Sequence, residues 1–249
     1  MKKQFWYFIF LLFYIGTLPV QGKITLPAIL SDNMVLQQKA QVRFWGKARP
    51  GEKVTVSTSW DKNIYTVQTP TDGHWEVKIK TPGVMDNQTL TVKGENTITI
   101  HNILIGEVWL CTGQSNMEFP VARDPNVKWK TGILNETEEM KDADYPSIRL
   151  FHVEHQLAPE GEKEDCIGRW LVCTPENVKE FSAVGFIFGR KLYKELQMPV
   201  GLIQSTWGGT HAESWTERRV MKDNPLYADV MEEFAPQNVK REKDKCKVP

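Results

Sequence analysis

The residues best suited to chemistry form the motif Gly-Gln-Ser-Asn-Met at positions 113–117, directly after an apolar run at 103–111. In α/β hydrolytic enzymes, a small-residue turn at the carboxyl end of a buried strand exposes a serine hydroxyl in the crevice at the sheet edge. Backbone N–H groups at the start of the next helix then point towards a developing oxyanion. The motif therefore predicts Ser115 as a nucleophile and its own N–H as an oxyanion donor. The same residues are also typical of an ordinary joint in which Ser115 caps a helix and Gly113 shapes the turn.

A second loop of this kind, Thr-Trp-Gly-Gly-Thr-His at 206–211, follows another apolar run at 200–205. Glycines at the end of a strand let the backbone approach a ligand closely, so the N–H of Gly209 is placed to complete an oxyanion hole. The alternative is a tight turn into a helix that starts near Ala212. Two such loops at one edge of one sheet are better evidence for a catalytic site than either loop alone.

A serine nucleophile near neutral pH also needs a base. His211 is the nearest histidine in sequence to Gly209, while His152 and His155 end a predicted strand, where crevice positions are available. The remaining two, His74 and His101, fall in a predicted β-rich region and at its end. A lone histidine is more often structural than catalytic. No Cys/His spacing in the sequence is typical of a zinc site, and we expect neither a metal nor an organic cofactor.

The first part of the chain, residues 23–100, is rich in short runs of β-branched and aromatic residues that alternate with polar ones. Turn signals such as Asp72-Gly73 separate these runs, and several strands at such spacing predict a small β-sandwich. The predicted strands are 42–45, 54–57, 64–67, 75–79, 90–92 and 97–100.

Three tryptophans in this region, Trp45, Trp60 and Trp75, allow two interpretations. They form either a platform for carbohydrate or part of the core of the β-sandwich. Aromatic residues in such domains more often lie in the core, and we expect that here.

From about residue 101, strands and helices alternate. We expect a helix around 132–142, a strand at 147–153, a helix capped by Ser182 and ended by Pro199, and a strand at 200–205. Alternation of this type predicts a parallel sheet with helices on both faces.

The chain of 249 residues has a formal net charge of zero, 41% hydrophobic and 25% charged residues, which is typical of a globular protein. Without a basic stripe, the sequence gives no indication of a nucleic-acid partner.

Lys2 and Lys3 precede an apolar run at 5–15, and small residues follow near Gly22, as in a cleavable secretory signal. A signal anchor is the alternative. We expect a signal peptide at 1–22, a β-sandwich at 23–100, an α/β domain at 101–249, a secreted or periplasmic location and no membrane span after cleavage.

The four cysteines are Cys111, Cys166, Cys173 and Cys246. In an oxidising compartment they allow three complete pairings, which the sequence does not rank. Cys111 lies in a predicted buried strand, and we expect it to be a packed free thiol.

Several blocks of the sequence resemble bacterial sialate O-acetylesterases. They are the opening at 26–37, the nucleophile block at 105–118, Phe-Ser-Ala-Val-Gly at 181–185, and the block at 201–210. The resemblance covers nearly all of the chain after residue 22 and follows the order of the family. It implies a β-domain followed by a flavodoxin-like SGNH-hydrolase α/β/α domain that removes acetyl groups from carbohydrate esters, including O-acetylated sialic acids.

The resemblance assigns Ser115 as the nucleophile and the backbone N–H groups of Ser115 and Gly209 as oxyanion donors, with no cofactor. The family also carries a Gln-Gly-Glu-Ser block with a third donor and an Asp-x-x-His block with the acid and base, and neither occurs in this sequence. We therefore expect a carbohydrate O-acetylesterase whose α/β domain is C-terminally truncated and which is inactive or incomplete as these 249 residues. The alternative is a non-catalytic fragment that binds glycans or a partner chain.

Overall fold

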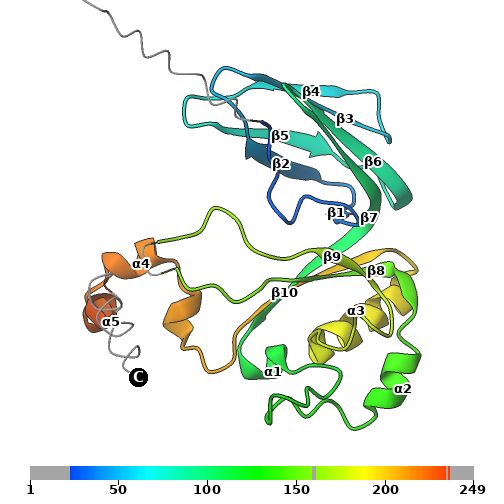
Figure 1. The fold of residues 1–249 in the computed structure, drawn as a ribbon, viewed down its shortest axis with the longest axis vertical. Helices are drawn as coiled ribbons and strands as arrows, with labels where there is room; N and C mark the ends of the chain where they lie inside the picture. Colours follow the sequence, from blue (N-terminus) through cyan, green and yellow to red (C-terminus); the bar gives the residue numbers. More distant parts are fainter. Residues whose placement is uncertain (1–22, 159–160, 234, 236–249) are drawn as a thin grey trace, which may run out of the picture.

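The computed structural model describes residues 23–158, 161–233 and 235 (Figure 1). The predicted signal segment 1–22 and Cys246 lie outside these residues. The strands are β1 (Val35–Gln37), β2 (Gln41–Lys47), β3 (Lys53–Thr58), β4 (Ile64–Gln68), β5 (His74–Lys80), β6 (Met85–Lys93), β7 (Thr97–Gly113), β8 (Tyr145–His152), β9 (Trp170–Cys173) and β10 (Val200–Thr206). The helices are α1 (Ser115–Glu118), α2 (Glu136–Lys141), α3 (Ala183–Leu196), α4 (Arg218–Lys222) and α5 (Ala228–Glu233), with 3-10 turns η1 (Ala212–Trp215) and η2 (Pro225–Tyr227).

The N-terminal part consists of strands β1 to β6 and the first half of β7. One sheet runs in the order β4-β3-β6-β7, β1 pairs with β7, and β2 and β5 form a separate two-stranded sheet. Strand β5 illustrates why these strands form, because Trp75, Val77 and Ile79 are buried while the residues between them are exposed. Side chains from both sheets meet in one hydrophobic core. Each predicted strand run is confirmed.

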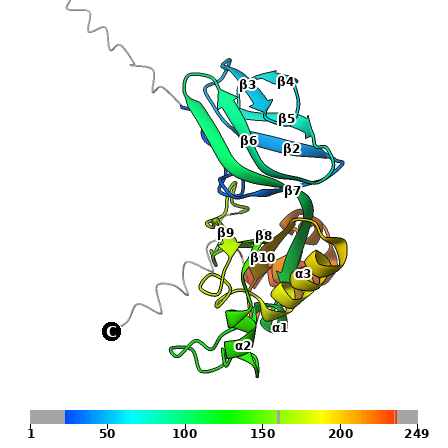
Figure 2. The same cartoon turned by 90° about the vertical axis from the view of Figure 1, so that its right-hand side faces the viewer.

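Strand β7 joins the N-terminal part to the rest of the chain (Figures 1 and 2). Residues 97–105 pair antiparallel with β6, whereas residues 107–113 pair parallel with β10. Strand β10 pairs parallel with β8, and β8 pairs antiparallel with β9. The result is a mixed α/β fold with one large central sheet. The boundary expected between residues 100 and 101 falls inside a continuous strand.

Helix α3 covers one face of the α/β part. Ser182 Oγ accepts a hydrogen bond from Gly185 N at 3.0 Å, which confirms the predicted helix cap. The helix packs so closely on β10 that a side chain at Gly189 would clash with Leu202. Leu110 alternates to the opposite face of the sheet and is 62% exposed. Among the described residues, helix α3 covers one face of this part of the sheet, and no helix covers Leu110 on the other face, so the expected cover by helices on both faces is not seen.

The tryptophans of the N-terminal part differ in burial. Trp75 is buried in the core, and Trp60 is half-buried against it, as expected. Trp45 is 37% exposed, so the interpretation of this residue as a core residue is wrong. Its position on β2 explains the difference, because Phe44 and Gly46 on either side of it point into the core.

The three described cysteines, Cys111, Cys166 and Cys173, have free thiols, and Cys111 is buried as expected. None of the helices in the described ranges combines the length and apolar character needed to cross a membrane.

Candidate active site

Ser115 lies where the sequence motif places it, between the end of β7 and the start of α1. Gly113 ends the strand with a φ of +137°, a backbone conformation that favours glycine. Gln114 occupies the N-cap position, and the exposed Ser115 donates from Oγ to Gln114 Oε1 at 2.9 Å. The interpretation of Ser115 as a simple helix cap is therefore wrong, and its hydroxyl faces solvent at the edge of the sheet.

The glycine loop after β10 lies directly beside Ser115. Trp207 N donates to Gly113 O at 3.0 Å, which joins the ends of the two parallel strands. A Cβ built on Gly208 would lie 3.7 Å from Ser115 Oγ. Gly209 has a φ of +77°, where a residue with a side chain would be strained. The two loops predicted at one sheet edge thus meet, and the loop also turns into the short helix η1, as the alternative interpretation expected.

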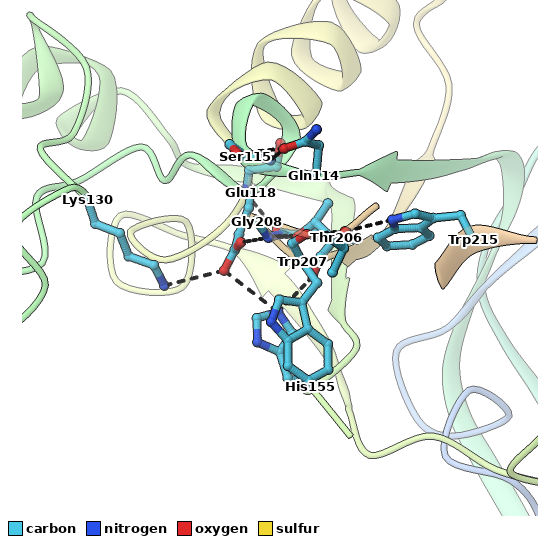
Figure 3. Close-up of polar contacts among 12 residues, drawn as sticks. Gln114, Ser115, Glu118, Lys130, His155, Thr206, Trp207, Gly208 and Trp215 are labelled. Carbon is cyan, nitrogen blue, oxygen red and sulfur yellow. Dashed lines mark hydrogen bonds and ion pairs between the residues drawn. The ribbon is translucent and has the colours of Figure 1, made fainter. Parts of the chain in front are cut away.

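Glu118 is a functional candidate that the sequence analysis did not single out. It is 6% exposed at the end of α1, and its Oε2 accepts a hydrogen bond from Gly208 N (Figure 3). Its Oε1 lies 3.7 Å from His155 Nε2 and 4.0 Å from Lys130 Nζ. The carboxylate therefore holds the glycine loop against the helix that carries Ser115. A spacing of three residues from Ser115, which puts both side chains on one side of a helical turn, is the signal that indicates this role.

His155 supports the same loop from the other side. Its ring stacks on Trp207, with 4.2 Å between ring centroids and 4° between ring planes (Figure 3). Its Nε2 lies 2.7 Å from Thr206 O, and because a carbonyl oxygen only accepts, Nε2 carries the proton. This nitrogen is therefore not available to accept the proton of Ser115.

The other histidines lie elsewhere. His74 is on β5, His101 is on β7 within the N-terminal part, and His211 is exposed just before η1. In the part of the chain that the structure describes, Ser115 Oγ makes its hydrogen bond to Gln114, and none of the histidines contacts it. His211 is the histidine nearest to Gly209 in sequence, and its role as a base stays a prediction.

Burial shifts the pKa of groups near the sheet. Burial lowers the pKa of His152, and the charges of His155 and Lys130 lower it further. Burial raises the pKa of the Cys173 thiol to about 12 and also raises that of Cys111. Both thiols are thus protonated at neutral pH and are poor nucleophiles or metal ligands. Within the described ranges, no group of three or more His, Cys, Asp or Glu side chains is arranged to hold a metal ion.

Two cavities lie near the Thr206–Gly208 segment. Ser115 opens into the smaller one, of about 290 Å³, lined by residues 114–117. The larger one, of about 460 Å³, lies on the side of Trp207 and His155 and also carries Trp45 and Trp215. We call this larger hollow the tryptophan cleft. Its volume is within the ~300–1,000 Å³ range of small-molecule sites.

The chain is similar to known carbohydrate esterases in sequence and in structure. The family described as carbohydrate esterase, sialic acid-specific acetylesterase matches residues 105–245. The sialate O-acetylesterases of Homo sapiens and Mus musculus are 37% and 36% identical to this chain over 214 residues. These matches cover 78% of this chain but only 39% and 37% of the relatives, so the chain spans about two fifths of their length. The crystal structure of a carbohydrate acetylesterase from Xanthomonas citri superposes with a TM-score of 0.72 at 30% identity, covering 81% of this chain and 44% of that one.

Proposed function

We propose, from the premise that this chain belongs to the sialic acid-specific acetylesterase family of carbohydrate esterases, that it supplies the nucleophile of a carbohydrate O-acetylesterase. The substrate class is O-acetylated sialic acid or a related acetylated glycan. The observation that carries the proposal is the meeting of the two loops, in which Gly208 lies against Ser115 and Gly209 follows in a left-handed conformation. The N–H groups of Trp207 and Gly208 are engaged by Gly113 O and Glu118, whereas the N–H of Gly209 makes no hydrogen bond among the described residues. A nucleophile beside a loop with such an available N–H donor is the arrangement that acyl transfer requires.

In the proposed reaction, Ser115 Oγ attacks the acetyl carbonyl carbon, and the C=O π electrons move to the oxygen. The N–H groups of Ser115 and Gly209 stabilise this oxyanion, and each such donor contributes about 10²–10³ in kcat. The C=O bond then re-forms, the C–O bond to the sugar breaks, and the sugar oxygen takes up the proton that Ser115 Oγ has lost, so the sugar leaves as its free hydroxyl. Water attacks the acetyl-serine, which releases acetate and restores Ser115.

The resemblance assigns the proton transfers to the histidine of an Asp-x-x-His block, which this sequence does not contain. His155 is an unsuitable substitute, because its Nε2 proton is directed at Thr206 O.

The finer fold assignment, a β-sandwich followed by an SGNH-type domain, also belongs to this proposal. Two facing sheets around one core support it, and a crystal structure in which β2–β5 did not face the larger sheet would contradict it.

The experiment uses the protein purified from its natural source, so that every segment of the natural polypeptide is present. It is treated with a fluorophosphonate probe and assayed for acetate release from O-acetylated N-acetylneuraminic acid, and recombinant variants of the same polypeptide are compared. We expect the probe to label Ser115 and Ser115→Ala to lose both labelling and acetate release. Ser57→Ala, on β3 and without a hydroxyl hydrogen bond among the described residues, is the matched control and should retain both.

Labelling of another serine, or full acetate release by Ser115→Ala, would refute the assignment. A folded natural protein that is inert on all acetyl esters but binds glycans would favour the non-catalytic alternative.

A further inference from the structure

The tryptophan cleft brings together indole rings from three separate elements. Trp45 comes from β2, Trp207 follows β10, and Trp215 belongs to η1. Trp45 is 37% exposed and Trp215 is 41% exposed. Large aromatic side chains are normally buried on folding, so indoles that share one hollow and remain in contact with water indicate a binding surface.

The rings of the cleft are held in position without a ligand. Trp215 Nε1 donates to Thr210 Oγ1 at 2.8 Å, and Trp207 is stacked on His155 (Figure 3). Trp45 sits on a strand that pairs with β5 over its whole length. Because these side chains lose little freedom on binding, the cleft is preorganised for a flat, partly apolar ligand.

The charge of the cleft selects against anions. Among the described residues, its lining contains the carboxylates of Glu154, Glu164 and Asp165 and the ammonium group of one lysine, Lys163. Glu164 forms an ion pair with Lys47 of β2, and Asp165 accepts a hydrogen bond from a backbone N–H of the N-terminal part. Even with Glu164 neutralised, two carboxylates face one ammonium group, so a ligand carboxylate would be repelled.

We propose that the tryptophan cleft binds an uncharged hexopyranose ring of the glycan whose acetyl group reaches Ser115, with Trp45 stacked on the apolar face of that ring. The inference rests on the proposed function, because Thr206 and Trp207 line the cleft and the next residue, Gly208, lies against Ser115. The N-terminal part of the chain thereby contributes to glycan selection, while the α/β part carries the nucleophile. Sialic acid itself, which is anionic, lies outside this cleft.

The test is ¹⁹F NMR of the natural-length protein labelled with 5-fluorotryptophan, in which Trp45→Phe identifies the signal of Trp45. The probes are the uncharged methyl glycosides of glucose, galactose and mannose, and the anionic methyl glycoside of N-acetylneuraminic acid. We expect at least one uncharged probe to shift the Trp45 signal at millimolar concentration, while the buried Trp75 does not respond and the anionic probe binds more weakly. Trp45→Ala should weaken the association about tenfold, the contribution of one ring stack.

The matched control is Trp109→Ala, which removes a tryptophan of similar exposure (42%) that packs on Phe188 outside the cleft. In steady-state assays, Trp45→Ala should raise KM for an acetylated glycan without lowering kcat for that substrate. KM for 4-nitrophenyl acetate, which has no sugar, should not rise. The inference is overturned if no uncharged probe shifts the Trp45 signal, if the anionic probe binds more tightly, or if both alanine variants weaken binding equally. Sugar binding without any ester hydrolysis would instead refute the proposed function and leave the cleft assignment standing.

Discussion

Removing the carboxylate of Glu118 is the perturbation that most directly tests how the site is held together. Glu118→Ala leaves Gly208 N–H without its acceptor and so removes the hydrogen bond between α1 and the glycine loop. A hydrogen bond to a charged group contributes about 1.5–3 kcal/mol, so the variant loses about that much of the free energy that holds the glycine loop against Ser115. If the Gly209 donor is lost from the oxyanion hole, kcat falls by about 10²–10³.

We therefore expect kcat of Glu118→Ala to fall by between about tenfold and a thousandfold, with little change in KM, because the oxyanion forms only in the transition state. Glu118→Gln keeps an oxygen that accepts from Gly208 N and should recover most of this loss. The assay is steady-state hydrolysis of 4-nitrophenyl acetate together with the rate of fluorophosphonate labelling of Ser115. Glu138→Ala, an exposed carboxylate on α2 with no side-chain hydrogen bond among the described residues, is the control.

Two results would refute this reasoning. A folded Glu118→Ala protein with the labelling rate of the unmodified protein would show that the hydrogen bond does not position the loop. Equal losses in Glu118→Ala and Glu118→Gln would show that the charge of Glu118, and not its hydrogen bond, is what matters. Thermal unfolding of each variant separates these results from a loss of fold.

Two further predictions concern residues near the same sheet edge. Gly208→Ala places a Cβ 2.8 Å from Glu118 Oε2 and should lower kcat at least tenfold. The control is Gly83→Ala, whose Cβ meets only Lys39 Cε at 3.8 Å and which should leave kcat unchanged. Equal kcat values for the two variants would contradict the packing argument. Because the pKa of His152 is lowered on folding, the unfolded chain binds more protons, and stability falls as the pH drops below the unfolded value of about 6.5. His152→Gln should therefore flatten the decrease in melting temperature between about pH 7.5 and pH 5, and an unchanged decrease would show that His152 does not cause it.

The sequence predicted most elements of this fold because their signals are local. The alternation in β5 and the cap at Ser182 depend on a few neighbouring residues, and both are found as expected. The long strand β7 was not foreseen as one element, because its two halves bury different faces in different cores and their hydrophobic patterns differ.

The candidate site could be assembled from the sequence only in part. Ser115 and Gly209 belong to loops whose composition indicates chemistry, so they could be named in advance. Glu118 and His155 act through contacts with a segment about 50 to 90 residues away, and no local pattern encodes those contacts. Trp45 was misassigned for a related reason, since alternation on β2 shows which residues share a face but not which face meets the core.

The position of Trp45 relative to Ser115 depends on how firmly the N-terminal part is joined to the α/β part. The core of the N-terminal part includes Phe151 of β8 and Trp170 of β9, so apolar side chains are buried across the junction. Trp170 Nε1 donates to Ile29 O at 2.8 Å, which adds a polar tie beside that core. Parts of a chain that share a hydrophobic interface and one continuous strand do not swing independently. The tryptophan cleft is therefore a preformed feature of the fold, and the glycan site proposed at Trp45 keeps a fixed position relative to Ser115.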